Sequence, residues 1–192
     1  MAISPTAPPV SASSRLFRTG VLACLLTLLA SLAGCASAPP AADAPLAFVI
    51  VRHAEKATND PHDPDLDAAG HARARALAGE LRAEPLAAVY ATEYRRTRQT
   101  AGPVAARHRL PVQAYYARAT AAQNTAHWRQ RHRHGTVLVV GHSNTVPDLV
   151  AALCGCTTPA MSDEEYDRLT FVRFDAQGQA QVETRRYGAP RH

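Results

Sequence analysis

Apolar residues along this chain come in short uninterrupted runs, separated by longer and partly polar segments. Residues 46–51 (LAFVIV) and 136–140 (TVLVV) show no polar alternation, which is typical of strands buried on both faces of a sheet. Shorter runs predict strands at residues 87–90 and 112–116. A hairpin is predicted from residues 169–174 and 180–185, around a turn at residues 176–178.

The segments between these runs carry helix signals. Asp67 is a predicted N-cap for a helix that extends through Leu81, and further helices are predicted at residues 93–107 and 146–153. Strands that alternate with helices predict an α/β fold, a three-layer sandwich with a mostly parallel central sheet and helices on both faces. Ligands of such sheets bind beyond the carboxyl ends of the strands, so the residues that follow each strand are the functional candidates.

Arginine and histidine side chains follow three of the predicted strands. Arg52 and His53 come directly after the first strand, Arg96 follows the second, and His142 follows the strand at residues 136–140. Arginine guanidinium groups match phosphoryl oxygens bidentately, and a neutral imidazole can attack phosphorus. Neighbouring positive charge also holds an imidazole unprotonated near neutral pH. The set therefore predicts phosphoryl chemistry.

Four segments resemble, in order and spacing, the motifs of the histidine phosphatase (phosphoglycerate-mutase-like) superfamily. Residues 51–55 (VRHAE) are similar to its R-H-G/A-E signature, and residues 66–78 to its L-T-x-x-G…A-x-x-L-A helix. Residues 91–101 (ATEYRRTRQTA) are similar to its (T/S)-S-x-x-x-R-A-x-Q-T-A segment, and residues 139–143 (VVGHS) to its second-histidine motif. The resemblance covers residues 46–188, and the chain looks like a small member of the branch-1 type.

The resemblance implies a phosphoglycerate-mutase-like fold and a role for each matching residue. His53 would be the phosphorylated nucleophile, Arg52 and Arg96 would clamp the phosphoryl oxygens, and His142 would be the second histidine of that pocket. Glu55 matches the signature and would contribute to substrate binding by orienting the pocket. Arg95 lies one residue before the position at which the family motif has its arginine, so it is expected at the protein surface or at the rim of the pocket.

The function expected from these residues is that of a metal-independent phosphatase. It would act on small phosphorylated substrates or on phosphoproteins, including phosphohistidine, through a covalent phosphohistidine and without a cofactor or metal. Two alternatives stay open: a phosphoglycerate-mutase-like phosphotransferase, and a non-catalytic, membrane-tethered binder of phosphorylated ligands.

The general acid is the unassigned part of this chemistry. Mutases of the superfamily take a glutamate from the stretch after the second arginine, and residues 97–147 contain no Asp or Glu. Glu55, Glu93 and Asp148 are the remaining candidates, or the acid is absent. An alkoxide leaving group needs a proton from a general acid. The lack of Asp and Glu at residues 97–147 therefore predicts a preference for substrates with better leaving groups, namely phosphohistidine, acyl or aryl phosphates.

The N-terminal 34 residues have the pattern of a signal peptide that is removed. The apolar run at residues 21–32 follows Arg15 and Arg18 and is too short to span a bilayer. Residues 32–35 (LAGC) resemble the lipobox of bacterial lipoproteins, which implies a lipidated Cys35, an Ala/Pro-rich tether over residues 35–45 and a domain over residues 46–188. The expected location is the bacterial cell envelope, at the outer membrane facing the periplasm. An ordinary signal peptide with an incidental cysteine is the alternative.

Composition limits the remaining possibilities. With 192 residues and 46% hydrophobic content, the chain is long enough for one globular domain. Of the net charge of +5, Arg15 and Arg18 of the leader supply two, and the remaining balance of +3 is too small to indicate nucleic acid binding. Two basic runs are predicted on exposed helix faces: Arg73 and Arg75, and Arg129, Arg131 and Arg133. His132 and His134 are predicted at a solvated helix end, and the loop around His62 is not favoured as a metal site. Cys154 and Cys156 are predicted as buried thiols rather than as a disulfide.

Overall fold

The computed structural model describes Met1 and residues 44–190, and residues 44–190 form one domain. Cys35 and the predicted signal peptide lie outside the described residues. Within the described part of the chain, no helix is both long enough and apolar enough to cross a membrane.

A six-stranded sheet forms the centre of the domain, in the order β3-β2-β4-β1-β5-β6. The strands β3, β2, β4 and β1 run parallel to one another, and β5 and β6 are antiparallel. Their bounds are β1 (Ala47–Arg52), β2 (Leu86–Thr92), β3 (Val112–Tyr115), β4 (Thr136–Gly141), β5 (Arg168–Phe174) and β6 (Ala180–Arg186). The predicted α/β class with a mostly parallel sheet is confirmed, including the antiparallel hairpin.

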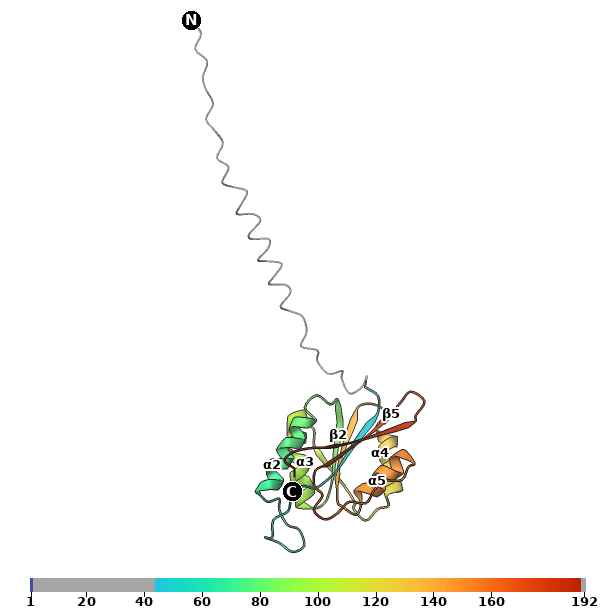
Figure 1. The fold of residues 1–192 in the computed structure, drawn as a ribbon. Helices are drawn as coiled ribbons and strands as arrows, with labels where there is room; N and C mark the ends of the chain where they lie inside the picture. Colours follow the sequence, from blue (N-terminus) through green and yellow to red (C-terminus); the bar gives the residue numbers. More distant parts are fainter. Residues whose placement is uncertain (2–43, 191–192) are drawn as a thin grey trace. The chain divides into compact units, whose positions relative to one another are not determined.

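Helices cover both faces of this sheet (Figure 1). The helices α2 (Ala68–Glu80) and α3 (Arg95–His108) lie together on one face, and α4 (Ala121–Arg131) and α5 (Val146–Cys154) lie on the other. The three predicted helices are present, and the side chain of Asp67 caps α2 by accepting a hydrogen bond from Gly70 N. α4 was not predicted as a complete helix, although Thr120 and Gln123 form a capping box at its start.

Two apolar cores result from the alternation of side chains along the central strands. In β1, Val49 and Val51 face α2 and α3, whereas Phe48 and Ile50 face the layer that contains Trp128 of α4. All of these β1 side chains are fully buried. An uninterrupted apolar strand is therefore required here, because both of its faces pack against helices.

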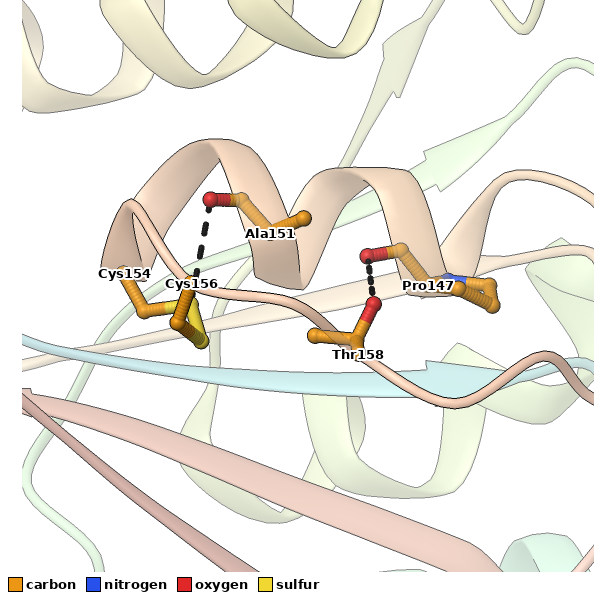
Figure 2. Close-up of a disulfide and its surroundings, with 5 residues drawn as sticks. All are labelled: Pro147, Ala151, Cys154, Cys156 and Thr158. Carbon is orange, nitrogen blue, oxygen red and sulfur yellow. Dashed lines mark hydrogen bonds between the residues drawn. A yellow bond between two sulfur atoms is a disulfide. The ribbon is translucent and has the colours of Figure 1, made fainter.

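Cys154 and Cys156 form a disulfide at the end of α5, so the prediction of free buried thiols was wrong (Figure 2). The helix ends at Gly155, whose positive φ of 65° turns the chain back on itself and brings the two cysteines together. The segment that follows runs back along α5, where the hydroxyl of Thr158 donates to the carbonyl of Pro147.

Candidate active site

The carboxyl ends of β1 and β4 place the two candidate histidines next to each other. Arg52 pairs with Gly141 across these strands, and the next residue, His53, donates its backbone N–H to the Gly141 carbonyl at 2.9 Å. His142 follows directly on the neighbouring strand. The two imidazole rings therefore lie 5.4 Å apart, centre to centre.

A pocket of about 400 Å³ opens at these strand ends. It brings together Arg52, His53, Arg96 and His142, the four residues expected to perform the chemistry. The rest of its lining comes from several loops and helix starts: Lys56, Tyr94, Ala117, Arg118, Ser143, Asn144, Thr145 and Asp163. Positive side chains thus outnumber the single carboxylate of this lining, which suits an anionic ligand.

His53 is held as a neutral imidazole with a fixed orientation. Its side chain is almost fully buried, and Nδ1 donates to the carbonyl of Ala54 at 2.7 Å, so the lone pair resides on Nε2. Burial lowers the pKa of His53 to about 3, with a smaller contribution from the positive charge of Arg52, while the hydrogen bond to Ala54 opposes the shift. An unprotonated Nε2 is the form of histidine that can act as a nucleophile.

Arg52 is positioned by a loop that the sequence did not indicate. Its Nη1 donates to the carbonyls of Ser162, Asp163 and Glu165 at 3.1, 2.8 and 3.2 Å. The guanidinium also lies over the ring of Tyr166, 4.0 Å from its centre. The loop acts mainly through main-chain oxygens, and these have no signature in the sequence.

Arg96, in the first turn of α3, lines the pocket. Its Nη1 is buried and makes no hydrogen bond within the described residues, and the nearest carboxylate oxygen, on Asp63, is 3.8 Å away. The guanidinium lies over the ring of Tyr94 at 4.4 Å. A buried cationic donor without a hydrogen bond is costly unless a ligand completes it.

The neighbouring Arg95 has a different environment. Its guanidinium makes ion pairs with Asp60, Asp63 and Asp65 at 2.9, 3.4 and 3.2 Å. It does not line the pocket. Arg95 therefore fastens the loop before α2 to the start of α3, and of the two adjacent arginines Arg96 is the one available to a ligand.

Glu55 lies beneath the pocket rather than in its lining. The carboxylate is buried and pairs with Arg73 at 2.8 Å, and Arg73 also donates to the carbonyl of Tyr187 at 2.7 Å. The prediction that Arg73 lies on an exposed helix face was therefore wrong. Gly70 belongs to the same arrangement, because a Cβ there would overlap the backbone carbonyl of Glu55.

His142 is connected to a pair of buried hydroxyl groups. Its Nε2 lies 3.0 Å from Thr92 Oγ1, and Thr92 Oγ1 lies 2.9 Å from Thr97 Oγ1. Burial and the charge of Arg96 lower the pKa of His142 to about 4, while the charge of Glu93 opposes this shift. Both threonines were part of the motif in the sequence, but their contact with His142 was not predicted.

Comparison with known proteins shows that part of the sequence matches a family model and that most of the chain matches solved structures in fold. Residues 48–116 match the histidine phosphatase superfamily (branch 1), a stretch that contains His53 and Arg96 but ends before His142. No curated protein sequence matches the chain.

Three solved structures illustrate the similarity. The protein histidine phosphatase SixA complexed with tungstate is 23% identical, with a TM-score of 0.58, covering 73% of this chain and 96% of that one. The putative phosphohistidine phosphatase SixA from Agrobacterium tumefaciens is 18% identical, with a TM-score of 0.54 and coverages of 76% and 99%. The mycobacterial glucosyl-3-phosphoglycerate phosphatase complexed with VO3 is 16% identical, with a TM-score of 0.59 and coverages of 75% and 99%.

The family match covers residues 48–116 only, and at such identities the solved structures show a shared fold. In this fold the carboxyl ends of parallel strands lie at one edge of the sheet, which explains why the motifs that follow β1, β2 and β4 meet at one pocket. Within the described residues, no group of three or more His, Cys, Asp or Glu side chains is arranged to hold a metal ion.

The carboxylates near this pocket occupy distinct positions. Glu55 is committed to its ion pair, Glu93 is exposed and does not contribute to the pocket lining, and Asp148 lines a neighbouring cleft of about 330 Å³. Asp163 does line the pocket, is exposed, and accepts a hydrogen bond from Ser143 Oγ at 3.4 Å. Sequence reasoning did not single out Asp163, because its motif-free loop lies about twenty residues beyond His142.

Proposed function

We propose that this chain is a histidine phosphatase that removes phosphate from its substrate through a covalent intermediate on His53. The observation that carries the proposal is the environment of His53. A neutral imidazole with its lone pair on Nε2 lies in one pocket with Arg52, Arg96 and His142. The match to the superfamily and the shared fold support the same activity.

In the first step, His53 Nε2 attacks the phosphorus atom and the bond from phosphorus to the leaving group breaks. Arg52 and Arg96 bind the phosphoryl oxygens and stabilise the charge that spreads over them in the transition state. In the second step, water attacks the phosphohistidine, the P–N bond breaks, and inorganic phosphate leaves with His53 restored. The hydrogen bond from Nδ1 to Ala54 keeps the ring in one orientation through both steps.

The substrates that fit best are phosphates with good leaving groups, such as phosphohistidine, acyl phosphates and aryl phosphates. Glu55 is held by Arg73, and Asp148 lies in the adjoining cleft, so neither is placed to protonate a leaving group in the pocket. Two of the similar structures are described as SixA-type protein or phosphohistidine phosphatases, which supports the same substrate class. The positive lining supports an anionic substrate.

A leaving-group series tests this proposal. We expect the rate of hydrolysis of substituted aryl phosphates to fall steeply as the pKa of the leaving phenol rises, because neither Glu55 nor Asp148 is placed to protonate the leaving group. A flat dependence would contradict this substrate preference, and a flat dependence that becomes steep in Asp163→Asn would assign the acid to Asp163. Efficient interconversion of phosphoglycerates would favour the mutase-like alternative. Binding of the phosphates without any turnover would favour the non-catalytic binder.

We further propose that the enzyme is anchored in the bacterial envelope through lipidated Cys35 and faces the periplasm. This rests on the apolar run at residues 21–32 and the sequence LAGC at residues 32–35. The Ala/Pro-rich residues 36–45 then serve as a tether between the anchor and the catalytic domain. Lipid chains contribute about 0.8 kcal/mol per buried methylene, so multiple chains hold a protein stably at a bilayer.

A further inference from the structure

A chain of three hydrogen-bonding groups links the backbone at the start of α3 to His142. Thr97 Oγ1 lies 2.8 Å from the carbonyl of Tyr94 and 2.9 Å from Thr92 Oγ1. Thr92 Oγ1 in turn lies 3.0 Å from His142 Nε2. Thr92 and Thr97 are fully buried, so no solvent competes for these contacts.

Counting protons along this chain determines the direction of each hydrogen bond. Thr97 Oγ1 lies 2.8 Å from the carbonyl of Tyr94 and 3.1 Å from the carbonyl of Thr92. Because a carbonyl can only accept, the single hydroxyl proton of Thr97 is directed to these main-chain oxygens. Thr97 Oγ1 then accepts from Thr92, whose own proton is thereby used. Thr92 Oγ1 can therefore only accept from the imidazole, which requires a proton on His142 Nε2.

We infer that Thr92 and Thr97 hold His142 as the Nε2-protonated tautomer, so that its Nδ1 lone pair serves the phosphoryl group. Thr92 is thus a positioning residue that acts through His142. The pKa of His142 is lowered to about 4, chiefly by burial, which keeps the ring neutral near pH 7. Nδ1 makes no hydrogen bond within the described residues and is not sealed from solvent, and His142 lines the pocket.

The two histidines of the site then have opposite tautomers and complementary tasks. His53 carries its proton on Nδ1 and uses Nε2 as the nucleophile, whereas His142 offers a proton acceptor at Nδ1. This inference rests on the proposed phosphatase function. A substrate that arrives as the phosphoryl monoanion can transfer its proton to Nδ1, and the imidazolium then donates a hydrogen bond to the phosphoryl oxygen. Product release reverses the transfer, so His142 finishes the cycle neutral.

Nuclear magnetic resonance tests the tautomers directly, independently of turnover. Two-bond ¹H–¹⁵N correlation spectra of the full chain in detergent micelles at pH 7.5 distinguish Nδ1–H from Nε2–H imidazoles, and His142→Gln and His53→Gln assign the two signals. We expect Nε2–H for His142 and Nδ1–H for His53. The Nδ1–H form at His142, or a mixture of the two forms, would overturn the inference whether or not the protein is a phosphatase.

Substitutions at Thr92 provide the functional test. Thr92→Val keeps the shape and removes the hydroxyl, so we expect loss of the single tautomer and a roughly 10- to 100-fold lower kcat/KM, as is typical when a partner that orients a functional histidine is removed. Thr92→Ser keeps the hydroxyl and should retain both the tautomer and the activity to within about a factor of three. Thr125→Val is the matched control, since Thr125 is buried in α4 and bonds only to carbonyls of its own helix.

The two readouts are interpreted together. If Thr92→Val keeps the wild-type tautomer and kcat/KM, the inference is wrong. If Thr92→Val fails to fold, the wild-type spectrum and Thr92→Ser decide the question, and loss of the Nε2–H signal in Thr92→Ser would also overturn it. Absence of any phosphatase activity, with the tautomers as expected, would reject the proposed function and leave the hydrogen-bond assignment standing.

Discussion

At the scale of single residues, the site depends on a contrast between adjacent side chains. Arg95 and Arg96 have the same charge and are neighbours in the chain, but Arg95 is paired with three carboxylates, whereas Arg96 has a buried nitrogen that lacks a hydrogen bond within the described residues. The spacing of the sequence motif predicted that Arg96, rather than Arg95, binds the ligand. The structure gives the physical reason, because Arg95 is occupied by carboxylates and Arg96 lines the pocket. The chemistry therefore depends on what each cation already binds, and not on the number of cations.

This contrast gives a matched pair of substitutions. Arg96→Ala should lower kcat/KM by roughly 10²- to 10³-fold, as expected when one donor to the transition-state oxyanion is lost. Arg95→Ala should change kcat/KM by less than about a factor of five, because Arg95 binds protein carboxylates rather than the phosphoryl group. Steady-state kinetics with an aryl phosphate measures both. Equal losses in the two variants would show that the assignment of the two arginines is wrong.

The buried histidines also make folding stability depend on pH. Their pKa values are lowered to about 3 for His53 and about 4 for His142, against about 6.5 in an unfolded chain. Below pH 6.5 the unfolded state binds protons that the folded state does not, so the free energy of unfolding must fall as pH falls toward 4. The loss is at most about 1.4 kcal/mol per pH unit for each histidine.

Urea unfolding at pH 7.5 and pH 5 checks this dependence. The wild type should lose more stability between the two pH values than the double variant His53→Gln/His142→Gln, which has no imidazole to protonate in the pocket. A double variant with the same pH dependence as the wild type would mean that other groups control acid stability.

At the scale of elements, the strands and most helices were predictable from the sequence because their burial is recorded in apolar patterns. α4 was not predicted as a whole, since most of its residues are polar or small and only Thr125 and Trp128 are buried. Its capping box at Thr120 and Gln123 is the signal that could have revealed it. The site motifs were recognisable in the same way, whereas the loop that holds Arg52 was not, because it uses main-chain carbonyls.

The prediction that Arg73 is exposed was wrong because the sequence does not reveal its distant partner. Arginine on a helix is usually exposed, and its partner Glu55 lies 18 residues earlier, in a loop whose path the sequence does not reveal. The structure turns this side chain inward, where it also holds the carbonyl of Tyr187. The pair joins α2 to the segment just after His53 and to the end of β6.

Loss of Arg73 should therefore destabilise the fold. Arg73→Ala leaves the buried carboxylate of Glu55 without its partner, which typically costs roughly 3–5 kcal/mol. Arg75→Ala, on the exposed side of the same helix, should change the free energy of unfolding by about 0.5 kcal/mol or less. Urea denaturation at pH 7.5 compares the two variants. A cost for Arg73→Ala no larger than that for Arg75→Ala would contradict a structural role for the ion pair.

At the scale of the whole molecule, the described domain and the N-terminal residues make separate contributions. The domain contains the pocket, the disulfide between Cys154 and Cys156 and both cores. The choice between thiols and a disulfide was not predictable from a C-x-C spacing, because it depends on the left-handed turn at Gly155.

Membrane attachment should depend on Cys35 alone among the N-terminal cysteines. Cys35→Ser should abolish incorporation of radiolabelled palmitate in a bacterial host, and the protein should then leave the membrane fraction or fail to mature. Cys24→Ser, which changes the other cysteine of the N-terminal region, should still incorporate the label. A wild-type protein that is unlabelled and free in the periplasm would show that the segment is an ordinary signal peptide.

The central claim, a phosphoryl group carried by His53, is tested most directly by trapping the intermediate. The full chain is mixed with a ³²P-labelled acyl or aryl phosphate, quenched within milliseconds in alkaline detergent, and the labelled peptide is mapped by mass spectrometry. The account predicts acid-labile, base-stable phosphate on His53, present in His62→Ala and absent in His53→Ala, which should also be inactive. Turnover without such a phosphoenzyme, or retention of more than about a few per cent of the wild-type rate by His53→Ala, would contradict it.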